Sequence, residues 1–435
     1  MNFVYIVLDT QRGDHLGCYD YWRDVSPNID RLAGEGVMFK DFYASAIATG
    51  PAFTSLITGL YPINHKFYLT PWNVANAINF DDDIPVVAEM FWDTKKYTTV
   101  AFDNLINFRS HMKQFVRGYE YHINVTRTSK WEHHLILADQ VNARMLPWIR
   151  NHGDEQFFMF VHYWDPHLPY NHPKEFRGLF KHEKGNVDDL KVVETPGGYE
   201  FVPGWGMLDL VYEGDENRSI DLYDEEVKYV DHAIGQLIET LDEKGILDDT
   251  CIIVTSDNGE SLGQHEIWGH AILDEATIYL PLVMRYPKGL PQGKVVEGYA
   301  QQSDIVPTLL DMAGITENLP PMDGRSLLPM MEGKDKGPEC VFAETGYHRS
   351  INMGDWKLIR GRNGELELYN LHDDPAEIDD LSQDEEAKAK EMEARLLDWV
   401  EEKLDGREDP MPDSDVPWTC YVGNDLKPDS RLKRS

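Results

Sequence analysis

The sequence predicts an α/β fold: a doubly wound, mostly parallel sheet with a smaller α+β C-terminal domain. Two patterns indicate it. Helix-like and strand-like segments alternate along most of the chain, which is typical of helices packed on both faces of one sheet. Several strand-like segments are also unbroken apolar runs, such as FVYIVLD at 3–9, as expected of strands buried on both faces.

The alternation can be followed along the chain in order. A helix is expected after Ser26, with Pro27 at its first position, because Ser is a good N-cap and Pro fits the first helical turn. A short helix is expected after the stretch AIATGPAF. The expected strands lie at 3–9, 37–45, 97–103, 156–165, 250–257 and 281–287, and the expected helices at 26–36, 53–60, 83–95, 136–152, 221–245 and 303–314.

Breaks in this pattern predict the domain organisation. Residues 1–337 are expected to form the catalytic domain, with a Gly-, Pro- and charge-rich insertion at about 170–220 that resembles a lid or substrate loop. Residues 338–410 carry short alternating strands, a turn at RNGE and one amphipathic helix, and are expected to form the C-terminal α+β subdomain. The Pro- and Asp-rich segment 411–435 is expected to be an extended tail.

Charge and composition exclude some classes of function. The chain has 435 residues, 42% of them hydrophobic, so it can bury a sizeable core. Its formal net charge of −35 repels nucleic acid and anionic membranes at long range. No nucleic-acid or membrane partner is therefore expected, and an anionic substrate would need a cation in the site.

The start of the sequence, its apolar runs and its cysteine spacing together predict a cytoplasmic protein. The chain opens directly into a strand-like run, so no signal peptide is expected. No apolar run approaches the length of a membrane span. The four cysteines lie far apart without CxxC spacing, which favours free thiols in a reducing compartment.

Acidic residues end two of the expected strands. Asp9 follows YIVL, and Asp257–Asn258 follows CIIVTS. Ligands of open α/β sheets bind beyond the carboxyl ends of the strands, and carboxylate and amide oxygens suit a divalent cation. The alternative is that each Asp is a helix cap or a turn residue.

The wider sequence resembles the sulfatase family of the alkaline phosphatase superfamily. The resemblance rests on VLDTQRGDHLGCYDY, SPNIDRLAGEGVMFKDFYAS and TGLYP near the start, on VTSDNGESLGQHEIWGH and YLPLVMRYP, and on SDIVPTLLDMAGI and GDWKLIRG near the end. These pieces occur in the family's order and span nearly the whole chain. The resemblance implies an alkaline phosphatase/sulfatase-like fold and an ester hydrolase.

The resemblance also implies one divalent metal ion: calcium, magnesium, manganese or zinc. Its ligands would be Asp9, Thr10, Asp257 and Asn258. Thr10 stands where the family usually has a second Asp. A neutral hydroxyl is a weaker ligand, so the affinity or the preference for a metal should differ. The related phosphonate monoester and phosphodiester hydrolases also lack that Asp.

The family's nucleophile motif is altered in this chain. Thr49 stands at the position of the Cys or Ser that becomes formylglycine, Pro51 matches the motif's Pro, and Phe53 replaces its Arg. Oxidation of a threonine hydroxyl would give a ketone, so no formylglycine is expected. TGPAF resembles the motif of the phosphonate monoester hydrolases, and other superfamily members use an unmodified Thr as nucleophile. Thr49 is therefore the candidate nucleophile, with a helix N-cap as the alternative reading.

Histidines supply the remaining candidates. His167, in DPHLPY, resembles the family's substrate loop and could transfer a proton to the leaving group. His270 takes the place of a Lys found in many sulfatases and is the other catalytic candidate. His65, His162 and His265 are the candidates for substrate binding. The sequence leaves the role of Asp103 and Asn104 open.

Three readings of function follow. The first is a metal-dependent hydrolase of phosphate or phosphonate esters with Thr49 as nucleophile, because water can release phosphate from a Thr ester. The second is a sulfuric ester hydrolase that works without formylglycine. The third is a catalytically impaired sulfatase-like binding protein. The expected partner is a small anionic ester substrate, and a homo-oligomer is possible.

Overall fold

The computed structural model describes residues 1–68, 80–105, 112–125, 136–168, 170, 172–180, 219–265, 269–270 and 272–412, and the backbone alone at 193–194, 200–201, 216–218, 266 and 268. The chain forms two compact units, each built from separate stretches of sequence. The first unit comprises Met1–Lys40, Ala88–Ser256 and Pro281–Val296. The second unit comprises Asp41–Val87, Asp257–Leu280 and Glu297–Ser435.

Most strands of a mixed, mostly parallel sheet belong to the first unit, whereas residues 41–43 and 297–301 of two of its strands fall in the second. From β8 to β4 the neighbouring strands run parallel, whereas β11 is antiparallel to both β8 and β2. The order across the sheet is β12 (Lys294–Gln301), β2 (Val37–Tyr43), β11 (Leu282–Arg285), β8 (Thr250–Ser256), β1 (Asn2–Leu8), β5 (Phe157–Tyr163), β3 (Thr98–Phe102) and β4 (Tyr121–Ile123). The predicted fold class is confirmed.

The central strands of this sheet are buried along their whole length. Every residue of β1, β5 and β8 is buried, as their continuous apolar sequences predicted. Leu8 at the end of β1 pairs with Tyr163 of β5 on one side and with Ser256 of β8 on the other. The three strands therefore end in register, at the edge where the sequence places its acidic residues.

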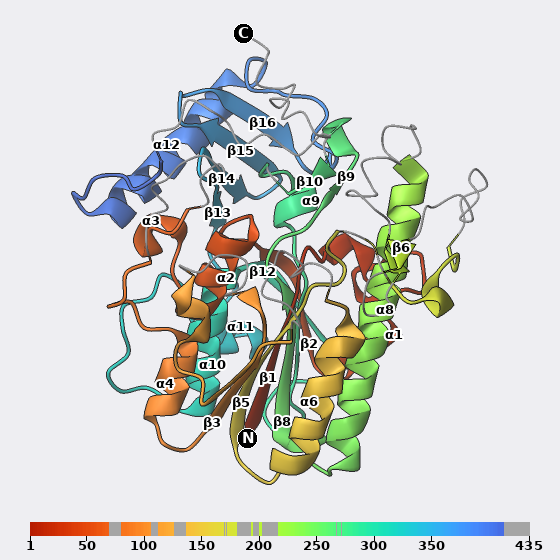
Figure 1. Cartoon of the computed structure of the whole chain (residues 1–435). Coiled ribbons are helices and arrows are strands. Elements are labelled where there is room, and N and C mark those ends of the chain that lie inside the picture. Colours follow the sequence, from red (N-terminus) through yellow and green to blue (C-terminus); the bar gives the residue numbers. More distant parts are fainter. Residues whose placement is uncertain are drawn as a thin grey trace. The chain divides into compact units, whose positions relative to one another are not determined.

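Helices cover both faces of the sheet in the first unit (Figure 1). Phe158 of β5 stacks on Phe91 of α4 (Val87–Asp93), with ring centroids 4.4 Å apart. Tyr163 of the same strand donates to Asn142 of α6 (Ala138–His152) at 2.6 Å. Residues an odd number apart on a strand face opposite ways, so α4 and α6 lie on opposite faces. On the α6 side lie also α8 (Glu216–Glu243) and α1 (Pro27–Glu35).

The first helix of the second unit is α2 (Thr49–Thr58). All ten of its residues are buried. The sequence predicted this helix to start at residue 53, four residues too late, because Gly50 and Pro51 have low helix propensity. Both in fact belong to its first turn. The unit also contains α3 (Pro62–His65), β9 (Ser261–Leu262), β10 (Trp268–Gly269), α9 (Glu275–Ile278), α10 (Ile305–Ala313) and α11 (Leu328–Met331).

A four-stranded antiparallel sheet follows in the second unit, in the order β13 (Cys340–Glu344), β14 (His348–Met353), β15 (Trp356–Gly361) and β16 (Leu366–Asn370). Helix α12 (Glu386–Leu404) packs on it. Phe342 of β13 stacks on Trp399 of α12, with centroids 4.5 Å apart, and Ile351 and Leu358 join the same core. The small C-terminal sheet and its helix match the α+β pattern that the sequence predicted.

Short elements complete the described chain. They are β6 (Val193–Glu194), β7 (Glu200–Phe201) and the 3₁₀ helices η1 (Gly13–His15), η2 (Gly17–Tyr19), η3 (Lys113–Val116), η5 (Lys174–Phe176), η7 (Leu247–Asp249), η8 (Gln264–Glu266) and η9 (Gln302–Asp304). Most of the predicted insertion at 170–220 and of the tail at 411–435 lies outside the described residues. The proposed domain limits stay predictions.

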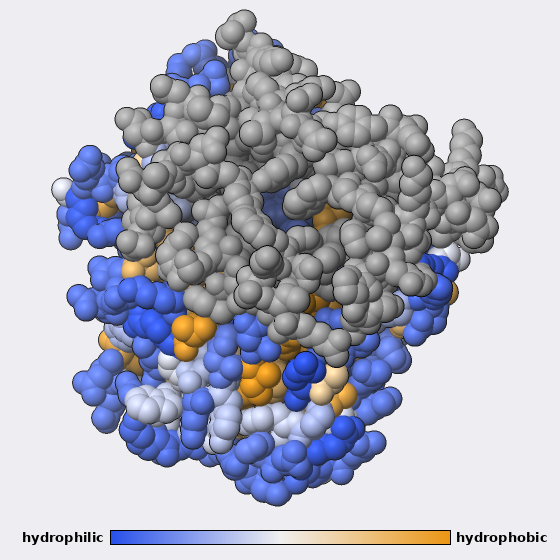
Figure 2. Space-filling model, in the orientation of Figure 1, coloured by the Kyte–Doolittle hydropathy of each residue, from blue (hydrophilic) through white to orange (hydrophobic). Residues whose placement is uncertain are grey.

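The described surface fits the high content of charged residues, which make up 27% of the chain. On the face drawn in Figure 2, the coloured part is mostly hydrophilic, with small hydrophobic areas. No helix within the described part of the chain is long and apolar enough to cross a membrane.

Candidate active site

In the first unit, Asp9 lies directly beyond β1. Its backbone N–H donates to Tyr163 O at 2.9 Å, which continues the pairing with β5. The side chain has no exposed surface, and its Oδ1 has no hydrogen-bond partner among the described residues. Burying a carboxylate oxygen without a hydrogen-bond partner costs free energy unless a cation binds it. Asp9 Oδ1 is therefore suited to be a metal ligand.

His162 holds the other oxygen of Asp9. Its Nε2 donates to Asp9 Oδ2 at 3.2 Å and its Nδ1 to Asp103 Oδ1 at 3.0 Å. Burial alone would lower the pKa of His162, but the hydrogen bonds to the two carboxylates raise it to about 9. His162 lies within β5, and it is 1% exposed.

The loop after Asp9 is fixed by a tyrosine from α8. Thr10 is buried and has φ +59, a left-handed conformation that is uncommon for a residue with a branched Cβ. The Tyr223 hydroxyl donates to Thr10 O at 2.8 Å and accepts from the Arg12 N–H at 2.9 Å. Tyr223 therefore holds the backbone of the predicted ligand Thr10 in its strained conformation.

His167 lies in a loop that α8 anchors through a buried histidine. His172 Nε2 lies 2.9 Å from Glu225 Oε2, and its Nδ1 lies 3.1 Å from Glu226 Oε1. All three side chains are almost completely buried. Asp165, also buried, has a pKa well above its ordinary value because of burial and the nearby Glu226. His167 itself is partly buried and donates from Nδ1 to Leu168 O at 2.5 Å.

In the second unit, Thr49 is the first residue of α2. The N-cap is Ala48, which has φ +72 and makes no side-chain cap, so the N-cap reading of Thr49 is wrong. Thr49 is 6% exposed, and its hydroxyl makes no hydrogen bond within the described part of the chain. Phe53, at the position of the family's Arg, is completely buried in α2.

The Asp257–Asn258–Gly259 turn is held by backbone contacts. Gln302 donates from Nε2 to Asp257 O, and the Asn258 N–H donates to Asp257 Oδ1 at 2.7 Å. Asn258 Nδ2 donates to Gly259 O at 2.9 Å, which turns the amide oxygen away from that carbonyl. A Cβ on Gly259 would lie 2.1 Å from Ala276 O, so only glycine fits here. The turn therefore presents an aspartate and an amide with little freedom.

Two histidines of the second unit each lie beside a carboxylate. His270 Nδ1 donates to Glu260 Oε2 at 2.9 Å, and Glu260 is 1% exposed. His265, with φ +56, has its Nε2 3.6 Å from Asp274 Oδ2. The closer pair, His270 with Glu260, has the arrangement of a general acid or base whose ring is oriented by a carboxylate.

His65 has a different environment. The Phe67 N–H donates to its Nδ1 at 3.0 Å, so the ring proton is on Nε2, which donates to Ser55 Oγ at 3.1 Å. The ring has no exposed surface, and burial lowers the pKa of His65 to about 3. His65 is thus a neutral histidine that ties α3 to α2.

The predicted metal ligands fall in both units, Asp9 and Thr10 in the first and Asp257 and Asn258 in the second. Within the described residues, no group of three or more His, Cys, Asp and Glu side chains is arranged to hold a metal ion. The predicted set has only two carboxylates, with a hydroxyl and an amide. All four side chains are completely buried, and their oxygen donors suit a hard cation.

Sequence reasoning missed three supporting residues. Glu260 directly follows the recognised turn and could have been noticed as an acid ten residues before His270. Tyr223 and His172 carry no sequence signal, because their role depends on α8 packing beside the loops after β1 and β5.

These features define a class. A mostly parallel sheet flanked by helices is also the fold of solved sulfatases and phosphonate monoester hydrolases. The chain belongs to the sulfatase family: the family's model matches residues 1–315, and the model described as N-sulphoglucosamine sulphohydrolase, C-terminal, matches residues 263–403. It is a hydrolase that acts on ester bonds.

Individual relatives are more distant. The multifunctional alkaline phosphatase superfamily protein PehA of Trinickia caryophylli is 26% identical over 401 residues, covering 77% of each chain. The choline-sulfatase of Rhizobium meliloti is 26% identical over 435 residues, covering 88% of this chain and 82% of that protein. The phosphonate monoester hydrolase of Agrobacterium radiobacter has a similar fold, with a TM-score of 0.74 at 20% identity over 93% of this chain and 96% of that one.

Proposed function

We propose that this protein is a metal-dependent hydrolase of small anionic phosphate or phosphonate esters, with the unmodified Thr49 hydroxyl as its nucleophile. The observation that carries the proposal is the position of Thr49. It begins a buried helix immediately after Ala48, a non-glycine residue with φ +72. Such strain costs about 1–3 kcal/mol and clusters at functional sites.

The local environment of Thr49 suits a nucleophile. Its hydroxyl makes no hydrogen bond to another described residue. The N-terminus of α2 carries partial positive charge, which favours negative charge developing on that oxygen. Attack by Thr49 Oγ1 on phosphorus would form a Thr–O–P bond and break the bond to the leaving alcohol, while the hydroxyl proton of Thr49 passes to solvent. Water would then attack phosphorus and break the Thr–O–P bond, releasing the phosphate or phosphonate and returning a proton to Thr49.

A threonine nucleophile favours phosphorus esters over sulfate esters. Formylglycine releases sulfate because its gem-diol can expel the group, and threonine has no second hydroxyl. A phosphorylated threonine can instead be attacked by water at phosphorus. A bound divalent cation would supply charge that lowers the pKa of a hydroxyl and stabilises anionic oxygens.

Residues of this chain would bind the cation, transfer the proton and bind the substrate. Asp9, Thr10, Asp257 and Asn258 would hold the cation, with His162 orienting Asp9. Glu260 orients the His270 ring through Nδ1, so that His270 would donate a proton to the leaving alkoxide. His167 is proposed to contact the substrate or share that proton transfer, and His265 to bind the substrate.

The second candidate is a sulfuric ester hydrolase that works without formylglycine. The observation in its favour is that relatives named choline-sulfatase and arylsulfatase align with most of the chain.

The location of the protein is a separate part of the proposal. We propose a reducing, cytoplasmic location, which is supported by the free thiols of Cys18, Cys251 and Cys340.

A metal-by-substrate screen tests the proposed function. The substrates are p-nitrophenyl phosphate, bis-p-nitrophenyl phosphate, p-nitrophenyl phenylphosphonate and p-nitrophenyl sulfate, each with Ca²⁺, Mg²⁺, Mn²⁺ or Zn²⁺. The expected result is turnover of a phosphorus ester that requires one of these metals and is lost in Thr49→Ala. Thr58→Ala is the matched control, since its hydroxyl lies in the same helix and donates to Thr54 O at 2.7 Å.

The other outcomes discriminate between the readings. Faster turnover of the sulfate would favour the second candidate. Turnover that survives Thr49→Ala would remove Thr49 as nucleophile. No turnover with any metal would favour a catalytically impaired binding protein.

A further inference from the structure

The C-terminal sheet and α12 enclose a pocket of about 270 Å³ that the proposed catalysis does not use. Three arginines and one aspartate are its charged lining residues, so the lining is positive in a chain whose formal net charge is −35. The full lining is Arg349, Arg360, Gly361, Arg362, Leu396, Leu397, Val400, Asp409 and Met411.

Strand register explains why the arginines gather there. Arg349 of β14 pairs directly with Arg360 of β15. Ile351 and Leu358, two residues away on the same strands, pair in the same way and belong to the core under α12. Because side chains alternate between faces, both arginines project from the core face of the sheet, beyond the end of its apolar part.

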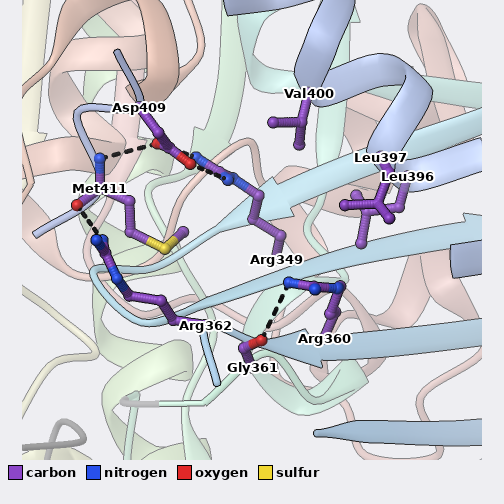
Figure 3. Close-up of a pocket in the computed structure, with 9 residues that line it drawn as sticks. All are labelled: Arg349, Arg360, Gly361, Arg362, Leu396, Leu397, Val400, Asp409 and Met411. Carbon is purple, nitrogen blue, oxygen red and sulfur yellow. Dashed lines mark hydrogen bonds and ion pairs between the residues drawn. The ribbon is translucent and has the colours of Figure 1, made fainter. Parts of the chain in front are cut away.

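Two like charges directly across a strand pair are unfavourable unless something compensates them. Arg349 is compensated: both its terminal nitrogens donate to Asp409 at 2.7 Å, and Nε donates to Glu344 at 2.8 Å. Figure 3 shows Asp409 over the Arg349 guanidinium at one end of the pocket.

Arg360 is only partly compensated. Its Nε donates to Glu393 at 2.9 Å and its Nη1 to Gly361 O at 3.3 Å. Its Nη2 has no hydrogen-bond partner among the described residues. The side chain lines the pocket and is 27% exposed, so part of it can be reached by a small molecule. Arg362 donates from Nη1 to the carbonyls of Met411 and Pro412.

The opposite wall is apolar. Leu396, Leu397 and Val400 project from α12 toward the arginines (Figure 3). Leu397 is 43% exposed, whereas Leu396 beside it is buried in the core under α12. One side of the pocket therefore suits an oxoanion and the other an apolar body.

We propose that this pocket binds a small organic anion, with its carboxylate, sulfonate or phosphonate group on Arg360 and its alkyl or aryl body against Leu397. The proposal is independent of the proposed catalytic function. A guanidinium binds an oxoanion through paired, directional N–H groups, which a lysine could not supply as well. The pocket volume limits the ligand to a small molecule.

Isothermal titration calorimetry on the full chain tests this site. The probes are 4-phenylbutyrate, the neutral 4-phenylbutan-1-ol, and acetate, which lacks the apolar body. The expected Kd for 4-phenylbutyrate is about 1 mM or tighter, on the scale of ligands of this size. Both other probes should bind at least about tenfold more weakly, because each lacks one of the two contacts.

Variants locate the binding. Arg360→Gln and Leu397→Ser should each weaken 4-phenylbutyrate binding by about tenfold or more. Arg325→Gln is the matched control, because Arg325 is also part-exposed and ion-paired, to Asp335 at 2.8 Å, but does not line the pocket. The proposal is overturned by absence of binding up to about 10 mM, by equal binding of the alcohol, or by equal losses in the control.

Discussion

Glu260 Oε2 lies 2.9 Å from Nδ1 of His270, and the carboxylate that holds the ring is 1% exposed. This pair is the strongest indication of acid–base chemistry in the second unit. A buried carboxylate fixes both the orientation of the ring and the nitrogen that carries its proton.

The first prediction concerns this pair. His270→Gln should lower kcat by about 10²–10⁴-fold, the usual contribution of a general acid. Glu260→Gln should lower kcat by about tenfold or more, because the ring is no longer oriented. Steady-state kinetics measure both. In a His270→Gln background, Glu260→Gln should have little further effect, since the two act as a unit. If the losses in kcat of the two single variants add up in the double variant, this account is wrong. Glu339→Gln is the control, because Glu339 is exposed.

The second prediction concerns pH. Burial alone would lower the pKa of His172, but Glu226 and Glu225 raise it to about 9, above the unfolded value of about 6.5. The stabilisation is therefore complete below about pH 6.5 and is lost as pH rises toward about 9. Wild type should lose up to about 3 kcal/mol more unfolding free energy than His172→Gln over this range.

Urea unfolding at several pH values measures that difference. His152→Gln is the control, because His152 forms a surface pair with Glu155 and should change the pH dependence little. Parallel pH curves for wild type and His172→Gln would contradict the assignment. Among the described residues, the carboxyl of Asp165 and the guanidinium of Arg177 also lie beside this cluster, and Arg177 Nε donates to His172 O.

The third prediction concerns the turn after β8. Gly259→Ala places a Cβ 2.1 Å from Ala276 O, so the turn must move. The variant should lose about 3 kcal/mol of stability or more, and activity with it, because Asn258 moves too. Gly34→Ala is the control: its Cβ meets nothing within 4 Å, and alanine should stabilise α1 by up to about 1 kcal/mol. Thermal unfolding compares the two, and equal effects would refute the close contact.

The fourth prediction concerns a buried lysine of the C-terminal sheet. Lys357 is completely buried, with its Nζ 2.7 Å from Glu377 Oε1 and 3.0 Å from Glu275 Oε1. Lys357→Met leaves buried carboxylates without a cation and should cost about 3–5 kcal/mol of unfolding free energy. Adding Glu377→Gln should restore part of the loss. Denaturant unfolding measures both, and an unaffected single variant would show that the cluster contributes nothing.

Local signals account for much of the fold and part of the candidate site. The central strands were predicted because strands buried on both faces read as continuous apolar runs. Asp9 and Asp257 were recognised because they end such runs. A role that depends on pairing between distant segments could not be predicted this way, even for His162, which was named as a candidate for substrate binding. His162 reaches Asp9 only because β5 lies beside β1, with Val7 opposite His162.

The start of α2 shows a second limit. Gly50 and Pro51 have low helix propensity, so local reasoning placed the helix after them. Tertiary packing overrides that preference, since every residue of α2 is buried. The correction matters for function, because it moves Thr49 from a cap position to the first residue of the helix.

The fifth prediction tests the central claim, that Thr49 is the nucleophile. The wild-type protein is mixed with its best phosphorus ester and metal, quenched during turnover, digested and analysed by mass spectrometry. The peptide that contains Thr49 should carry one phosphoryl or phosphonyl group. Thr49→Ser should carry the same group, and Thr49→Ala should carry none and be inactive. Turnover by Thr49→Ala at the wild-type rate, with no modified peptide in either protein, would contradict the account.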